Sequence, residues 1–194
     1  MSACSSLPHS EKHNWVYDIG AGGSARRLTF GGRDRFPVWS SDSQRVSFQS
    51  DREGDLGLFW QRADGVGAAE RLTTPDKGVA HVAQSASRDG RWLLMDQTAD
   101  SKTSLMVFSF KDKSATPFGG VVSTLPTGAI FSPDDRWVAY STRDTPNTSN
   151  VVFVQPFPAT GAKVQVSSNT EDGHHQVWSS DGKDSTTHRG PATG

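Results

Sequence analysis

Histidines are the residues of this chain that could hold a metal ion. His174 and His175 are adjacent in the sequence, and His81 could join them in a zinc site. Adjacent residues of a strand point to opposite faces, so at most one of His174 and His175 could share a site with His81. The single cysteine, Cys4, excludes a cysteine-based metal site and an internal disulfide framework. We therefore expect no metal site and no cofactor.

Carboxylates and serines are the next groups that could do chemistry. Paired carboxylates occur at Asp134-Asp135 and among Asp51, Glu53 and Asp55. Both sets fall in expected turns, where aspartate caps backbone N–H groups. The sequence contains neither the Gly-x-Ser-x-Gly pattern of a nucleophile elbow nor a phosphate-cradling Gly-x-x-x-x-Gly-Lys-Ser/Thr pattern. We therefore expect no catalytic residues, and a protein that is not an enzyme.

Four copies of one short phrase organise the whole chain. Each copy reads as a strand, a tight turn centred on an aspartate, and a second strand with alternating apolar residues. The copies are Trp39-Ser-Ser-Asp42-Ser43, Ala86-Ser-Arg-Asp89-Gly90, Phe131-Ser-Pro-Asp134-Asp135 and Trp178-Ser-Ser-Asp181-Gly182. The turn aspartates are separated by 47, 45 and 47 residues. A period in the forties with several strands per period is typical of β-propeller blades.

The repeats predict an all-β propeller of four-stranded antiparallel blades. Complete blades are expected at 31–74, 75–120 and 121–169, and half blades at 14–30 and 170–183. In the best copy the strands span roughly 35–40, 44–50, 56–62 and 69–73, and Asp64-Gly65 is a strong hairpin signal between the last two. Arg27-Leu-Thr29 recurs as Arg71-Leu-Thr73, which marks 14–30 as the second half of a blade.

The two ends of the chain lack the apolar alternation of the blades. Residues 1–13 are polar without periodicity, so we expect them to be unstructured. In the last copy, Ser185 and Thr187 stand where Val46 and Phe48 stand in the best copy. A strand there has no apolar face to bury, so we expect residues 184–194 to fray. The half blades could pair to close a small ring, or the chain could form an open arc.

The turn residues have structural roles in this interpretation. Trp39, Phe131 and Trp178 are expected to pack, and Gly90 and Gly182 to supply a positive φ. Ser43 and Asp135 occupy that glycine position at a cost of about 1 kcal/mol each. Ala86 replaces an aromatic residue and loses roughly 2–3 kcal/mol of burial. These departures predict an intact architecture of reduced stability.

The repeats resemble the TolB-like β-propeller family, whose repeat is a Trp-Ser-Pro-Asp-Gly variant of the WD-type blade. The resemblance covers about residues 14–183, and no copy here keeps all five motif residues. The stretch from Val154-Gln-Pro-Phe-Pro158 to Trp178-Ser-Ser-Asp-Gly-Lys183 also resembles propellers associated with bacterial serine/threonine protein kinases. TolB-like propellers usually have six or more blades. An arc cut from a larger propeller is favoured over a closed ring, because the trailing half blade lacks a usable second strand.

Charge and hydropathy restrict the classes of partner. The net charge is −1 with no basic stripe, which argues against nucleic acid or an anionic membrane surface. No run approaches the ~20 apolar residues of a membrane span, and no signal peptide is visible. The compartment is cytoplasmic by default and periplasmic by resemblance. An open arc leaves faces of its end blades unburied, which predicts self-association.

A partner-binding rim follows from propeller logic. The loops between blades and the loops after the second strand share one face around the channel. Mixed charges on that rim suit a protein or peptide partner, whereas local ion pairs among solvated loops are the alternative. The candidate rim residues are Arg33, Arg35, Asp51, Arg52, His81, Arg143, Asp144 and His174.

Two functions remain open, besides a degenerate fragment with no function of its own. The first is a non-enzymatic interaction, scaffold or sensory module, part of a larger bacterial protein. The second is the gating propeller of a prolyl-oligopeptidase-type serine peptidase whose catalytic domain lies outside this chain. A kinase domain upstream would favour the first, and a Gly-x-Ser-x-Gly domain downstream the second.

Overall fold

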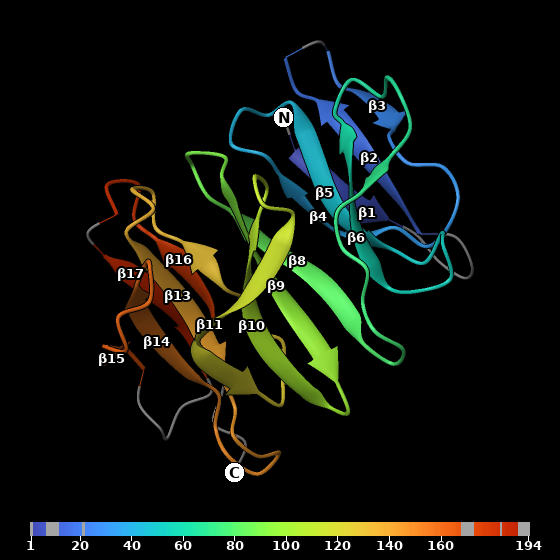
Figure 1. Ribbon diagram of the computed structural model, residues 1–194. Coiled ribbons are helices and arrows are strands. Elements are labelled where there is room, and N and C mark those ends of the chain that lie inside the picture. Colours follow the sequence, from blue (N-terminus) through green and yellow to red (C-terminus); the bar gives the residue numbers. More distant parts are fainter. Residues whose placement is uncertain (1, 7–11, 21, 168–172, 183, 190–194) are drawn as a thin grey trace.

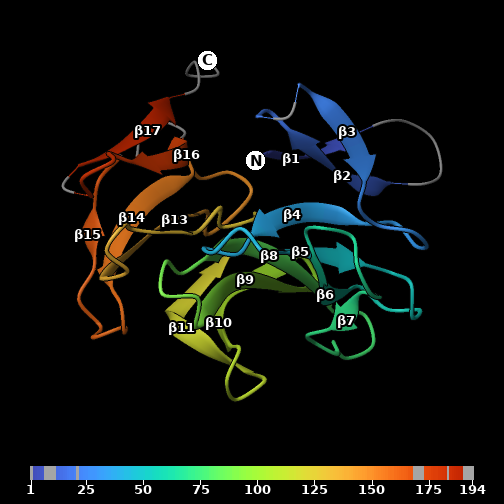
Figure 2. The same cartoon turned by 90° about the horizontal axis from the view of Figure 1, so that it is seen from above.

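The computed structural model describes residues 2–6, 12–20, 22–167, 173–182 and 184–189. These residues form antiparallel sheets that follow one another in chain order around a common centre (Figures 1 and 2). The first sheet has three strands: β1 (Ser2–Ser6), β2 (His13–Asp18) and β3 (Ser24–Arg27).

Three four-stranded sheets follow, and a two-stranded sheet comes last. The second sheet contains β4 (Arg35–Trp39), β5 (Arg45–Ser50), β6 (Gly57–Arg62) and β7 (Glu70–Arg71). The third contains β8 (Ala80–Ala86), β9 (Trp92–Ala99), β10 (Lys102–Ser109) and β11 (Ser114–Ser123). The fourth contains β12 (Ile130–Phe131), β13 (Trp137–Thr142), β14 (Val151–Pro156) and β15 (Val164–Gln165). The last contains β16 (Gly173–Trp178) and β17 (Ser185–Arg189).

The hydrophobic core lies between successive sheets, as it does in a propeller. One cluster joins the first two sheets through Val16 and Val46, and another joins the second and third through Leu58 and Leu93. The largest cluster joins the third and fourth sheets and includes Tyr140. The fold is therefore an all-β propeller of four-stranded antiparallel blades, as the repeats predict.

The four turn aspartates hold their turns by one repeated set of hydrogen bonds. In each turn a serine Oγ donates to the aspartate two residues later, over 2.6–2.7 Å, and accepts the backbone N–H five residues later. The residue after each aspartate has a positive φ: +57° at Ser43, +71° at Gly90, +58° at Asp135 and +70° at Gly182. Asp42, Asp89, Asp134 and Asp181 thus act as turn residues.

A second repeated hydrogen bond ties the third strand of a sheet to the end of its fourth strand. A backbone N–H at the third strand donates to a hydroxyl fifteen residues later: Asn14 to Thr29 (3.0 Å), Leu58 to Thr73 (3.0 Å) and Val152 to Ser167 (2.9 Å). The bond makes Asn14, Leu58 and Val152 equivalent positions. It therefore places β2 and β3 as the third and fourth strands of their sheet.

Both ends contain a strand that the sequence did not predict. Residues 1–13 were expected to be unstructured, yet β1 pairs with β2, with Ala3 opposite Val16. Residues 184–194 were expected to fray, yet β17 pairs with β16, with Ser185 opposite Trp178. Backbone hydrogen bonds along an open strand edge need no apolar alternation in the added strand. Residues 190–194 lie outside the described part.

Two further boundaries differ from the expected ones. β11 continues to Ser123, past the boundary expected at residue 120, and β2 begins at His13. The three-stranded first sheet and the two-stranded last sheet are separate sheets in the described chain. Strand pairing between them therefore does not close the arc into a ring of four-stranded blades.

Candidate functional site

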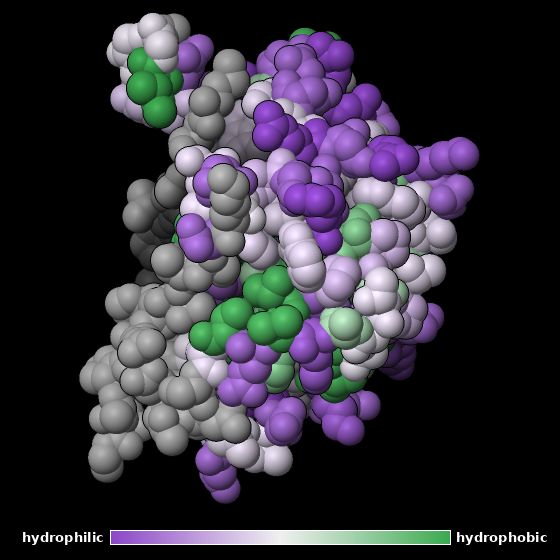
Figure 3. Space-filling model, turned by 90° about the vertical axis from the view of Figure 1, so that its left-hand side faces the viewer, coloured by the Kyte–Doolittle hydropathy of each residue, from purple (hydrophilic) through white to green (hydrophobic). Residues whose placement is uncertain are grey.

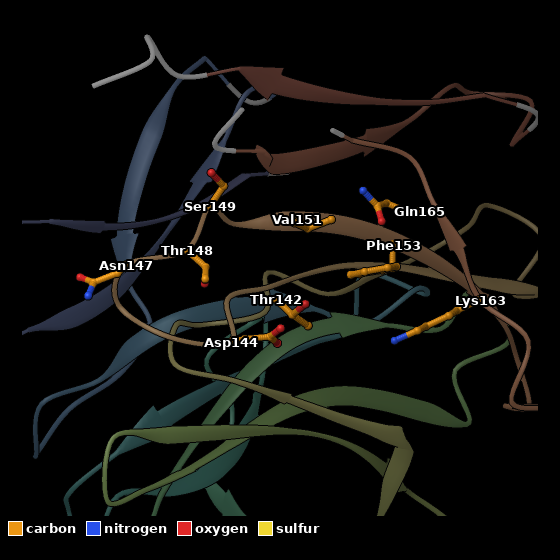
Figure 4. A pocket seen from close by; sticks show the side chains of 9 residues that line it. All are labelled: Thr142, Asp144, Asn147, Thr148, Ser149, Val151, Phe153, Lys163 and Gln165. Atoms are coloured by element: carbon orange, nitrogen blue, oxygen red, sulfur yellow. The ribbon is translucent and has the colours of Figure 1, made fainter. Parts of the chain in front are cut away.

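A pocket of about 450 Å³ lies at the outer end of the fourth sheet (Figure 4). Its walls come from the end of β13, the connection to β14, β14 itself and the segment around β15. The lining residues are Thr142, Asp144, Asn147, Thr148, Ser149, Val151, Phe153, Lys163 and Gln165. All but Val151 and Phe153 are polar or charged.

The Phe153 ring in this pocket contacts two other side chains. The Lys163 ammonium lies 4.7 Å from the ring centroid, and the Tyr140 ring stacks at 6.0 Å with an interplanar angle of 28°. The Tyr140 hydroxyl donates to Gln155 Oε1 over 3.0 Å, and burial raises the pKa of Tyr140 to about 12. Tyr140 therefore remains a neutral support for the Phe153 ring.

The connection between β13 and β14 is held by hydrogen bonds at its start and within it. The Arg143 N–H donates to Ser123 Oγ over 3.0 Å, and its carbonyl accepts the Thr124 N–H over 2.8 Å. Within the connection, Thr148 Oγ1 donates to the Thr145 carbonyl over 2.9 Å. These bonds fix the position of Asp144 at the mouth of the pocket.

A second hollow of about 210 Å³ adjoins this pocket and shares four of its lining residues, Asp144 and Lys163 among them. Gly119 and Gly120 of β11 form its far wall. Gly119 has a φ of +56°, which favours glycine, and a Cβ there would also contact the Gln155 side-chain amide closely. The groove therefore runs from the third sheet to the fourth, with opposite charges along it.

Three of the candidate rim residues form local ion pairs. Arg33 donates to Asp51 through both its backbone N–H and its side-chain Nε, over 2.7 and 2.6 Å. The backbone hydrogen bond is the main cause that lowers the pKa of Asp51. Arg52 donates to the buried Asp34 over 2.9 Å. Arg33, Asp51 and Arg52 therefore bind their neighbours within the second sheet.

The remaining rim candidates are dispersed. His81 was expected on the rim but is buried, with its Nδ1 2.8 Å from Thr73 Oγ1, and burial lowers its pKa. His81 belongs to β8, the innermost strand of its sheet, and this position explains its burial. Arg35 is half-buried on β4. His174 belongs to β16, and its side chain lies outside the described part. Of the rim candidates, Asp144 lines the pocket described above.

Sequence reasoning missed Lys163, Phe153 and Gln165 as pocket residues. They lie on β14 and around β15, which the sequence identified only as strands. Lys163 and Gln165 alternate with Val164 along one short segment, and that polar alternation was the available signal.

A buried carboxylate, that of Asp96 on β9, lies outside this pocket. Asp96 accepts hydrogen bonds from the Thr127 hydroxyl and N–H, over 2.6 and 2.9 Å, and from Gln84 Nε2, over 2.7 Å. Burial raises its pKa to about 6, against the effect of these bonds. Because Thr127 precedes β12, the contact joins the third sheet to the fourth and is structural.

The described residues offer neither a metal-binding cluster nor a membrane-spanning helix. No group of three or more histidine, cysteine, aspartate or glutamate side chains there could hold a metal ion. The described chain also contains no helix of the length and hydropathy needed to cross a membrane. The pocket offers charge pairing through Asp144 and Lys163 and an apolar contact on Phe153, which are means of binding a ligand.

No protein-family model matches the chain. An 81-residue segment is 33% identical to the uncharacterized peptidase YuxL of Bacillus subtilis. The segment makes up 42% of this chain and 12% of that protein. The match therefore covers a small part of the curated relative.

Solved structures match nearly the whole chain at low sequence identity. TolB from Acinetobacter baumannii superimposes with a TM-score of 0.74 and 17% identity, over 93% of this chain and 44% of that one. A putative TolB from Agrobacterium tumefaciens superimposes with a TM-score of 0.71 and 17% identity, over 97% of this chain and 70% of that one. A prolyl endopeptidase superimposes with a TM-score of 0.60 and 14% identity, over 84% of this chain and 27% of that one. The chain has the fold of the TolB-like β-propellers.

Proposed function

We propose that this chain is a non-catalytic recognition module that binds an extended peptide segment of a partner protein. The observation that carries the proposal is the convergence of Asp144 and Lys163 on one pocket beside the Phe153 ring. A basic group of the peptide would pair with Asp144, and an acidic group with Lys163. Opposite charges placed in this way favour a ligand of one orientation.

The comparisons support binding as a use of this fold without naming a partner. The structures of similar fold include TolB and a nidogen/laminin complex, whose description is that of a protein–protein assembly. They also include oligogalacturonate lyase and a gluconolactonase, so the fold itself is shared by binding proteins and enzymes. The proposal therefore depends on the pocket and not on the fold.

A peptide array with mixed charges, followed by fluorescence anisotropy on the peptides that bind, tests this function. Asp144→Asn and Lys163→Gln should each weaken binding by about 1 kcal/mol, roughly fivefold in Kd. Arg62→Gln is the matched control, because it removes a charge from the exposed Arg62–Asp64 ion pair outside the pocket. Binding that is insensitive to both pocket variants would exclude this site.

A second function, the propeller of a serine peptidase, is favoured by the 33% identity with YuxL over 81 residues. In that case the propeller would control access to a catalytic domain encoded elsewhere. Sequencing of the gene on both sides of the present chain tests this alternative. A Gly-x-Ser-x-Gly segment in the same reading frame would support it, and a kinase domain there would favour a sensory module instead.

A further inference from the structure

The junctions between neighbouring sheets are built on one repeated contact. The residue directly after the third strand enters a groove on the preceding sheet. Its position is set by its backbone N–H, which donates to a carbonyl at the turn of its own sheet: Ala63 to Gln44 (2.8 Å), Phe110 to Arg91 (3.1 Å) and Phe157 to Arg136 (2.8 Å). We call this residue the plug of its sheet.

Two of the grooves are filled by aromatic plugs. Phe110 stacks on Trp60 of the preceding sheet, with centroids 5.1 Å apart and an interplanar angle of 15°. Phe157 packs edge-on against Trp92 at 5.8 Å and stacks near Phe118 at 6.1 Å. The first junction has the small plug Ala63, and a hollow of about 280 Å³ remains beside it. The size of the plug thus corresponds to how fully the groove is filled.

No plug among the described residues enters the corresponding groove of the fourth sheet, a hollow of about 510 Å³ that Trp178 and Gly182 of the last sheet also line. Trp137 stands where Trp92 stands one sheet earlier, and Val154 stands where Val107 does. Val164 and Val166, from the segment of β15, form the outer wall and are 59% and 44% exposed. Figure 3 shows a compact hydrophobic patch on this side of the molecule. We call this feature the tail groove.

An unused plug stands at the opposite end of the arc. The repeated Thr29 and Thr73 hydrogen bonds make Asn14 equivalent to Leu58, so Ile19 is equivalent to the plug Ala63. Ile19 directly follows β2, the third strand of its sheet, and is 68% exposed. An exposed plug at one end therefore corresponds, among the described residues, to a groove without a plug at the other.

We propose that two copies of this chain associate head to tail, with Ile19 of one copy in the tail groove of the other. The contact continues the series of junctions that already holds the sheets of one copy together. In such a junction β16 and β17 supply the first two strands of a blade, and β2 and β3 of the second copy supply the last two. One surface binds a different surface, so the interface is heterologous.

The association leaves the peptide pocket accessible. Val164 and Val166 line the tail groove, whereas Lys163 and Gln165 line the pocket that contains Asp144. Alternate residues of this segment thus serve the two features separately. The inference therefore stands independently of the proposed function.

Sedimentation velocity of the full chain over a range of concentrations tests the association. The wild type should form species larger than a monomer. Ile19→Asp removes the plug and Val164→Asp disrupts the groove, so each should weaken association about tenfold or more. Val66→Asp is the matched control, because Val66 is 65% exposed, lies between β6 and β7, and belongs to neither end. Its association should equal that of the wild type.

A mixture of the two end variants separates the proposal from loss of folding. Ile19→Asp keeps an intact groove and Val164→Asp keeps an intact plug, so together they should form a one-to-one dimer. Neither variant alone should form that dimer. A wild type that stays monomeric at every concentration, or a mixture without heterodimer, would overturn the proposal.

Discussion

The carboxylate of Asp135 accepts a hydrogen bond from the backbone N–H of Asp89, the turn aspartate of the preceding sheet, over 2.9 Å. Its second oxygen accepts the N–H of Arg88 over 2.8 Å. Asp135 holds a φ of +58° at a position where two other repeats have glycine. The strained backbone thus places a carboxylate that connects the turns of two sheets.

This connection predicts opposite effects for the same substitution at two equivalent positions. Ser43 has a φ of +57°, and Ser43→Gly should raise the free energy of unfolding by about 0.5–1 kcal/mol. Asp135→Gly relieves the same strain but removes two hydrogen bonds to a charged acceptor, so it should lower stability by about 1 kcal/mol. Urea denaturation measures both, and changes of the same sign would refute the role of Asp135.

The plugs predict a second pair of effects on stability. Phe157→Ala removes an aromatic side chain that contacts three rings and should cost about 3 kcal/mol. Ala63→Phe should gain about 1 kcal/mol, because a hollow of about 280 Å³ lies beside Ala63. Thermal denaturation followed by circular dichroism measures both variants. Destabilisation by Ala63→Phe would show that the first junction does not accept the plug of the others.

Asp96 predicts a dependence of stability on pH. Burial raises its pKa to about 6 from an ordinary 3.8, so the folded chain binds more protons than the unfolded chain between those values. Its contribution to stability therefore falls as the pH rises through this window, by at most on the order of 3 kcal/mol.

Asp96→Asn isolates this contribution. Relative to the variant, the wild type should gain stability as the pH falls from about 7 to about 4. Burial lowers the pKa of His81, so the contribution of His81 to stability falls as the pH falls below the ordinary pKa of histidine. His81 is present in both proteins, so this contribution cancels in the comparison. Urea denaturation across this range measures the difference, and a difference that does not vary with pH would contradict the burial of an ionisable Asp96.

Strand β1 should limit the strength of the head-to-tail association. β1 pairs with β2 along the edge that β17 of another copy would use, since β17 and β1 both stand in second-strand position. Replacing Ala3 and Ser5 by proline should weaken the β1–β2 pairing and strengthen association several-fold. Sedimentation velocity measures the change. Weaker association in this variant would mean that β1 supports the contact instead of competing with it.

The sequence predicted those features of the fold that its side chains encode repeatedly. The turn aspartates and the alternation of Val46 and Phe48 were sufficient for the propeller and for most strands. β1 and β17 were missed, because backbone pairing along an open edge leaves no apolar pattern in the added strand. The alternation that reveals a strand with one buried face is absent from both.

The candidate site was less predictable than the fold. Asp144 was identified from its loop. Lys163 and Phe153 reach the same pocket because β14 pairs with β15, and the sequence of such short strands does not specify the register of their pairing. His81 was expected on the rim, and its place at the start of an inner strand buries it. Equivalent residues such as Phe110, Phe157 and Ile19 became visible only once the repeated hydrogen bonds aligned the sheets.

Photo-crosslinking from position 19 tests the junction series and its continuation between copies most directly. A chain with benzoylphenylalanine in place of Ile19 is mixed with an isotope-labelled wild-type chain, irradiated and analysed by mass spectrometry. The head-to-tail contact predicts crosslinks from the labelled peptides that contain Trp137, Val154 or Val164. Crosslinks confined to the photoreactive copy, or to labelled peptides outside the tail groove, would contradict it.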